Sequence, residues 1–338
     1  GRERDTETES AGGELAPRAR PGMLYERASL NALCFLSGFG FLALEVLWTR
    51  MFSQVLENSV YTFAAILVIV LLCLAGGALI SSRLARLQVS TATVLTLLVL
   101  VSGVAVALTP FLFMWQTHAF QIVALKGSWS AYLALIFRKG FLTIGLPALM
   151  LGTVFPYLMK IEETRTQSAG ASLGRLAAIN TAGAILGSLA CGFVFIEVLG
   201  MWRTMRLIAV IYLVTVLVLP IAWNRAAIAL KSFSILFLVL IFTILDPAGL
   251  PVSSVDALRP HEEILETWEG SDCTVAVVRD PHGLSIKVNS HYGLGSTGAL
   301  MQEKLQADLP LYIYPDTESI FFLGMGTGIT AGSALDSQ

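Results

Sequence analysis

Seven stretches of 17–25 residues that contain almost no charge constrain this chain more than any other feature. Together they cover 145 of the 338 residues and hold only three of its 46 charged side chains, Glu45, Glu197 and Lys231. A helix of about 20 apolar residues crosses the roughly 30 Å hydrocarbon core of a bilayer. The sequence therefore predicts a polytopic α-helical membrane domain with spans at 31–48, 59–80, 91–115, 140–159, 176–199, 207–223 and 226–244.

The charged residues divide the chain into two parts of opposite sign. Residues 246–338 carry 13 acidic and 4 basic side chains, a net charge of −9, whereas the preceding residues carry +7. A region this acidic repels phosphates, which excludes nucleic acid as a partner. The basic excess near the spans favours lipid headgroups, so the predicted partner is the bilayer. We expect a multi-pass protein of the inner (plasma) membrane.

The number of spans stays open between seven and eight. Lys and Arg are divided almost equally between the two sets of loops, so they do not set the orientation. A weaker apolar segment at 119–137, interrupted by Lys126, would add an eighth span and reverse the carboxyl end.

Two local patterns mark the spans. Trp48 and Arg50 end the first span as an interface anchor, and Gly183 and Gly187 of the fifth span predict close approach of another helix.

The sequence also predicts how the rest of the chain is organised. Residues 1–28 are polar and expected to be disordered, 29–245 form the membrane domain, and 246–262 are a linker. Thr274–Arg279 and Leu284–Asn289 are predicted strands of a β-hairpin, with Asp280–Gly283 at its turn. A helix is predicted at 298–307 and a buried strand at 319–323.

A glycine-rich loop follows directly after this last predicted strand. Gly324, Gly326, Thr327 and Gly328 stand between the strand and a helix start. Glycines let a nucleotide-like ligand approach the backbone, and a helix amino terminus supplies free N–H groups. The four residues are therefore the candidate ligand-binding residues of a Rossmann-like α/β domain. The four Cys and four His show no metal-binding spacing, and no metal is expected.

Longer stretches of the chain resemble one family. DLPLYIYPDTESIFFLGMGTG is similar to the first nucleotide-binding loop of spermidine synthase-type aminopropyltransferases. SGFGFLALEVLWTRMF, LPALMLGTVFPYLM and INTAGAILGSLACGFVFIEVLG resemble the membrane half of fused transmembrane spermidine synthase-like proteins, which is itself similar to part of a major facilitator superfamily transporter. Residues 263–338 then resemble the beginning of an S-adenosylmethionine-dependent methyltransferase-type domain.

The resemblance implies a function in polyamine biosynthesis, namely alkyl transfer from S-adenosylmethionine or its decarboxylated form to an amine. The adenosyl compound would be a co-substrate, with no tightly bound cofactor. The residues that recognise a diamine in that family are replaced by a set of neutral residues, which predicts weak or no transfer to putrescine: Asn289, Gly293, Gly298, Ala299 and Gln302. The acceptor is then a small-molecule amine or a membrane-associated amine.

Two further expectations concern the parts that the resemblance leaves open. The family's catalytic Asp would lie beyond residue 338, so the spermidine synthase-like domain is expected to be incomplete and its catalytic residues are unknown. The alternative is a non-enzymatic transporter-like or scaffold protein whose soluble domain senses a ligand, with a second copy of the chain as a candidate partner. Because adenosyl compounds are cytosolic, we expect residues 246–338 on the cytoplasmic side.

Glu45 is the one acidic residue well inside the first predicted span. An ionisable group in a spanning helix favours a functional role. The alternative is a carboxylate near a helix end that pairs with a neighbour such as Arg50. Five residues place the two side chains about 140° apart around the helix, so they are poor mutual partners.

Overall fold

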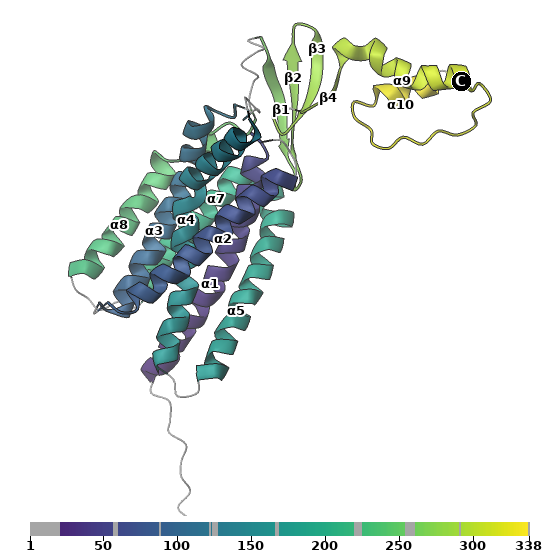
Figure 1. Cartoon of the computed structure of the whole chain (residues 1–338). Coiled ribbons are helices and arrows are strands. Elements are labelled where there is room, and N and C mark those ends of the chain that lie inside the picture. The colour runs from purple at the N-terminus through teal and green to yellow at the C-terminus, as the bar shows by residue number, and fades with distance from the viewer. Residues whose placement is uncertain are drawn as a thin grey trace, which may run out of the picture.

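The fold consists of a helical bundle followed by a small sheet and two further helices (Figure 1). The computed structural model describes residues 21–336 except 57–59, 88, 122, 124–127, 166–168, 220–224, 254–260 and 291. The bundle is formed by α1 (Pro21–Phe52), α2 (Val60–Leu84), α3 (Thr91–Thr117), α4 (Trp129–Arg165), α5 (Ala169–Ala190), the π-helical η1 (Cys191–Phe195), α6 (Ile196–Leu199), α7 (Met201–Val218) and α8 (Arg225–Thr243).

Seven helices among the described residues are long and apolar enough to cross a membrane, with α5, η1 and α6 forming one span. The predicted multi-pass helical domain is confirmed at this level. The prediction of an eighth span at 119–137 is wrong for the residues that the structure describes there. Residues 118–120 form a turn after α3, and 129–137 belong to the first part of α4. Without a second apolar stretch, Trp129–Phe137 extends an existing span.

The beginning of α1 differs from the predicted boundary of the tail. The helix starts at Pro21, inside the segment 1–28 that was expected to be disordered, and residues 1–20 lie outside the described part. Proline is favourable at a first helical position, where its missing N–H group has no helical partner. No glycine or proline interrupts the chain between this turn and the apolar span, so the helix continues.

Small residues bring α1 and α5 together. Gly183 and Gly187 face the backbone of α1, where an added Cβ would overlap the carbonyl oxygens of Phe35 and Phe39. Gly38 of α1 meets the backbone of α5 in the same way. This close approach is the packing that the small-residue stripe of the fifth span predicts.

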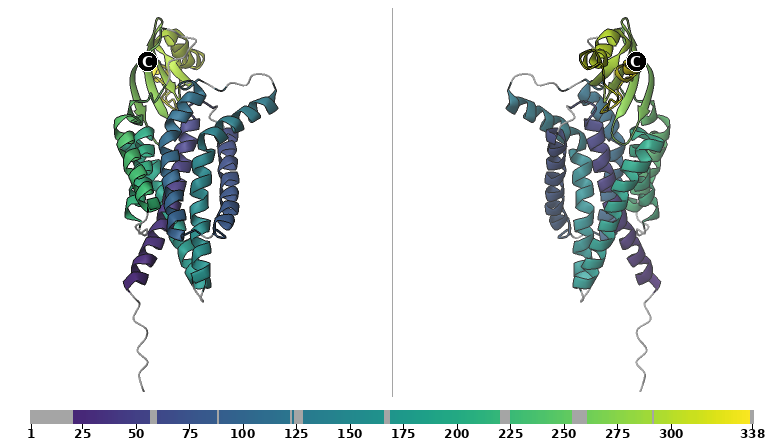
Figure 2. Two further views of the ribbon diagram at one scale, coloured as in Figure 1. Left: turned by 90° about the vertical axis from the view of Figure 1, so that its left-hand side faces the viewer. Right: turned by 90° about the vertical axis from the view of Figure 1, so that its right-hand side faces the viewer.

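The sheet lies beyond the end of the bundle opposite the start of α1 (Figure 2). Its strands pair antiparallel in the order β1 (Glu263–Glu269), β2 (Thr274–Asp280), β3 (Gly283–Val288) and β4 (Tyr292–Ser296). The predicted hairpin is therefore confirmed as β2 and β3, and the Asp280 carboxylate accepts a hydrogen bond from the His282 N–H at 2.8 Å in its turn.

The more buried face of the hairpin carries a lysine. Lys287 is 7% exposed and pairs across the strands with the fully buried Ala276. Its ammonium forms an ion pair with the buried Glu262 carboxylate. Leu284, on the other face, is 40% exposed. The apolar residues of β3 therefore share the face opposite Lys287, and the charge on the more buried face has a partner that precedes β1.

The region after the sheet contains η3 (Thr297–Ala299), α9 (Leu300–Ile313) and α10 (Ile329–Asp336). The helix predicted at 298–307 is confirmed and continues through Pro310. The predicted strand at 319–323 is wrong, because these residues have no regular secondary structure and pair with none of the described strands. A buried parallel strand needs neighbours on both edges, and the described sheet contains only β1–β4. The Rossmann-like fold therefore stays a prediction.

A buried hydrogen-bond network attaches the sheet to the end of α1. The Arg50 guanidinium donates to the Asn289 side-chain oxygen at 2.9 Å and to the Thr274 hydroxyl at 2.8 Å. Gln54 donates to the same hydroxyl at 2.8 Å and accepts from Ser290 at 3.2 Å. Asn289 adopts a left-handed backbone, with φ of 48°, which asparagine tolerates better than most residues. The sheet is therefore held by specific polar contacts.

A second attachment joins β1 to the beginning of α7. The Glu269 carboxylate accepts the Met201 N–H at 2.8 Å, so the strand supplies an acceptor for one of the free donors at this helix end. Burial raises the pKa of Glu269, while the hydrogen bond from Met201 and the charges of Arg50 and Arg203 act in the opposite direction. Folding therefore shifts the protonation equilibrium of Glu269 toward the proton-bound form.

Candidate functional site

The glycine loop connects the segment 319–323 to the first turn of α10. Gly324, Gly326 and Gly328 have φ angles of 92°, 55° and 78°, all in the left-handed region. An added Cβ at Gly324 or Gly328 would meet no protein atom within 4 Å, so the space in front of the loop is open. The Gly328 N–H donates to the Met325 carbonyl at 2.9 Å and closes the turn. A backbone of this shape suits close approach by a ligand.

Glu303 of α9 holds the loop in place. One carboxylate oxygen accepts the hydroxyl of Thr327, and the other accepts the Ser296 N–H at 2.7 Å. The Glu303 carbonyl also accepts the Thr330 hydroxyl at 2.9 Å. The Glu303 side chain therefore connects the end of β4 with the glycine loop, and its backbone carbonyl adds a contact to α10.

A polar cavity of about 580 Å³ lies on the other side of Ser296. Three of the positions where the resemblance implies amine recognition line it together, namely Gly298, Ala299 and Gln302. The cavity also contains acidic and imidazole side chains from outside those positions: His261, Glu262, Asp280 and His282. Because Glu262 is paired with Lys287, the negative charge of its walls comes from Asp280, and the implied positions themselves are neutral.

The other two positions implied for amine recognition lie elsewhere. Asn289 is fully buried against α1, where it accepts from Arg50, and it does not line the polar cavity. Gly293 of β4 is exposed, and an added Cβ would meet no atom within 4 Å. Of the five replaced positions, the structure thus brings three together and assigns Asn289 to the attachment of the sheet.

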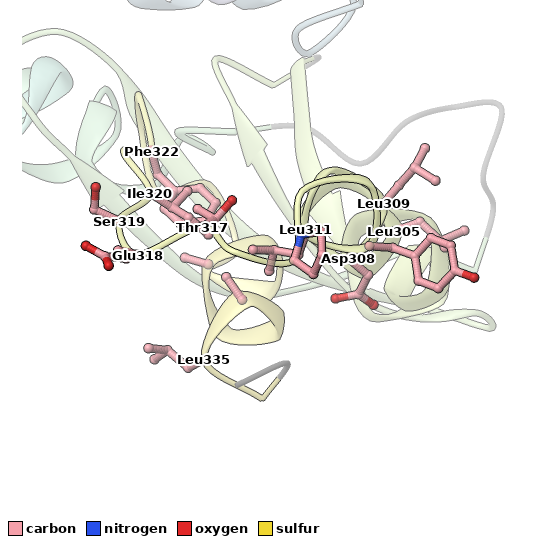
Figure 3. A pocket seen from close by; sticks show the side chains of 14 residues that line it. Leu305, Asp308, Leu309, Leu311, Thr317, Glu318, Ser319, Ile320, Phe322 and Leu335 are labelled. Atoms are coloured by element: carbon pink, nitrogen blue, oxygen red, sulfur yellow. The ribbon is translucent and has the colours of Figure 1, made fainter.

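A cavity of about 790 Å³ lies between α9, α10 and residues 315–322 (Figure 3). Leu305 and Leu309 of α9, Leu335 of α10 and Phe322 form much of its apolar lining, with Asp308 at one side. None of Gly324, Gly326, Thr327 and Gly328 lines it. This cavity and the predicted glycine site are therefore separate, and their assignment to a ligand stays a prediction.

Two contributions to the site could not be found from the sequence. Glu303 stands next to Gln302, but its contacts to Ser296 and Thr327 depend on how α9 folds back on β4. Asp280 enters the polar cavity because the hairpin turn lies beside η3. An acidic residue on the helix before a glycine loop was the only available signal for Glu303. Within the described part of the chain, no group of three or more His, Cys, Asp and Glu side chains is arranged to hold a metal ion.

Comparison of the chain with protein families, curated proteins and solved structures found no match. The function of this protein is therefore inferred from its residues and their geometry.

Proposed function

We propose that this protein is a membrane-bound, spermidine synthase-like transferase that moves an aminopropyl or other alkyl group from an adenosyl sulfonium compound to an amine. The observation that carries the proposal is the Glu303 carboxylate. It connects Thr327 of the glycine loop with Ser296, which lines the polar cavity at the positions implied for the amine. The two halves of the expected site, one for the adenosyl group and one for the amine, are thereby neighbours.

The reaction needs positioning more than covalent help from the protein. The lone pair of a neutral amine attacks the carbon bound to the sulfonium, the C–N bond forms as the C–S bond breaks, and the electron pair moves to sulfur. The positive charge passes to the nitrogen, which then loses a proton. Asp280 in the wall of the polar cavity favours an amine there, and holding the reactants in line supplies much of the rate. Glu303 acts as a positioning residue, and the proton acceptor is not assigned.

Binding of the adenosyl group can be tested at one glycine. Gly326→Asp places an anion where the ligand must approach the loop. With φ of 55°, this position accepts Asp better than most residues, and the added Cβ has only an ordinary contact, 3.8 Å from the Leu294 oxygen. Calorimetry on the full chain in detergent should show binding of S-adenosylmethionine or its decarboxylated form, and loss of binding in the variant.

Gly249→Asp is the matched control, because it adds the same charge at a glycine with no atom within 4 Å of an added Cβ. The wild-type protein and this control should bind alike. An intact wild-type protein that binds no adenosyl compound would refute the proposal and favour the sensing or scaffold alternative.

The amine is proposed to differ from putrescine, since Gly298, Ala299 and Gln302 offer no carboxylate or phenol. A turnover assay with decarboxylated S-adenosylmethionine and putrescine should give little or no spermidine. Efficient spermidine formation would show that Glu262 and Asp280 replace the missing groups.

A site that uses cytosolic adenosyl compounds also implies an orientation of the chain in the membrane. Seven spans leave the beginning of α1 and the sheet at opposite ends of the bundle (Figure 2). We therefore propose that the beginning of α1 faces the outside and the sheet faces the cytoplasm. A reporter fused after Asp246 and active only in the periplasm would contradict this orientation.

A further inference from the structure

A third cavity, of about 410 Å³, lies at the end of the bundle that carries the sheet. Its apolar wall consists of Leu42 and Val46 of α1 and Phe63 near the start of α2. Its polar wall comes from Glu45 and Arg50 of α1 and from Asp272 in the turn between β1 and β2. Because the cavity lies where two spans end, it stands at the depth where the headgroups of a bilayer meet its acyl chains.

Arg50 shows that this cavity has capacity for an anionic oxygen. The side chain is 6% exposed, and its two terminal nitrogens donate to neutral oxygens of Ser53, Thr274 and Asn289. Its Nε is buried and has no hydrogen-bond partner among the described residues. No described carboxylate lies within ion-pair distance, 4.0 Å, of the guanidinium. Glu269 and Asp272 act on its charge only from longer range. A buried charge is most stable beside a hydrogen-bonded anion, so the guanidinium favours one.

Glu45 gives the same cavity a preference for a cationic group. Its carboxylate lies in a membrane span, and no hydrogen bond or ion pair to it is found within the described part of the chain, although its backbone carbonyl accepts the Thr49 hydroxyl at 2.9 Å. Asp272 adds a second carboxylate from the sheet side. Two carboxylates beside an apolar wall favour an ammonium group that can donate hydrogen bonds to them.

We infer that this cavity binds the headgroup of an aminophospholipid of the phosphatidylethanolamine class. The ammonium would lie with Glu45 and Asp272, the phosphate would lie beside the Arg50 guanidinium, and an acyl chain would follow Leu42, Val46 and Phe63. Phosphatidylcholine has no ammonium N–H to donate. Phosphatidylglycerol brings a net negative charge to a cavity that already has two carboxylates and one guanidinium. The inference does not depend on the proposed alkyl transfer.

Lipid titration of the purified full chain, followed by native mass spectrometry, tests the inference. Phosphatidylethanolamine, phosphatidylcholine and phosphatidylglycerol with identical acyl chains are the probes. We expect phosphatidylethanolamine to bind at least about tenfold tighter than either of the others. Glu45→Gln should reduce that preference to about twofold or less, and Asp272→Asn, at an exposed turn, should reduce it by a smaller factor.

Glu197→Gln is the matched control, because Glu197 is an exposed acidic residue of another span and lies outside this cavity. It should keep the full preference. Equal binding of the three lipids, or equal losses in Glu45→Gln and Glu197→Gln, would overturn the inference. Displacement of the lipid by an equal concentration of soluble phosphoethanolamine would also overturn it, because the cavity would then select a free amine rather than a membrane lipid. The adenosyl-binding calorimetry is unaffected by any of these results.

Discussion

The helical bundle and the α9–α10 region both expose large apolar side chains, but the exposure has a different meaning in each. Leu72 of α2 and Phe141 of α4 are 55% and 49% exposed on membrane spans, where acyl chains cover them. Phe321 and Leu323 are 86% and 94% exposed outside every span. In water, each exposed Å² of apolar surface forgoes about 25 cal/mol. The exposed apolar surface of the bundle is therefore covered by acyl chains, whereas residues 319–323 bury little apolar surface in the fold described.

The polar attachment between the two regions offers the largest expected effect. Arg50→Ala removes one charged donor each from the buried oxygens of Asn289 and Thr274, which keep hydrogen bonds from the Thr274 N–H and from Gln54. Losing a hydrogen bond to a charged group costs about 1.5–3 kcal/mol. We expect a loss of about 3 kcal/mol in the docking of the sheet, and about 100-fold faster hydrogen exchange in β2 and β3. Arg225→Ala, at an exposed position at the start of α8, should leave the exchange unchanged. Unchanged exchange in Arg50→Ala would show that the network does not hold the sheet.

Packing inside the bundle should give the next largest effect. Gly187→Val forces α5 away from Phe39 of α1, and overpacking of this kind costs about 1–3 kcal/mol. Thermal unfolding in detergent should occur several degrees lower than in the wild type. Gly174→Val, on the same helix but with no atom within 4 Å of an added Cβ, should unfold near the wild-type temperature. Equal shifts in both variants would mean that valine acts through helix propensity alone.

The contact between β1 and α7 should make stability depend on pH. The folded-state pKa of Glu269 is raised above its ordinary value of 4.5, so the proton-bound form is favoured by folding. Its contribution is fully present below that ordinary value and is lost as the pH rises through the raised pKa. Thermal unfolding measured from pH 4 upward should therefore show a decline that Glu269→Gln removes. Parallel curves for the two proteins would contradict the pKa direction.

The smallest effect is expected where the apolar side chains face water. Leu323→Ser should change the free energy of unfolding by less than about 0.5 kcal/mol, because the side chain has almost no contacts to lose. Leu47→Ser, at a fully buried position of α1, should cost several times more. Chemical unfolding followed separately in the two regions provides the comparison. A loss above about 1 kcal/mol in Leu323→Ser would show that this segment is covered in solution.

The sequence was sufficient for features that depend on neighbouring residues alone. The absence of charge over about 20 residues predicted the spans, and the Gly183–Gly187 spacing predicted the close helix contact. The alternation and the turn residues at 280–283 predicted the hairpin. Each of these is a local pattern whose period or length matches one element of structure.

Only the tertiary structure decided what depends on residues far apart in the chain. Arg50 looked like an interfacial anchor, but it donates to Asn289 and Thr274, more than 200 residues away. Lys287 is buried because Glu262 meets it, and Glu303 matters because α9 returns its carboxylate to Ser296 and Thr327. The residues 319–323 carry a strand pattern, yet they form no strand without partners. Pairing over such distances is set by how whole elements pack, and no local pattern encodes it.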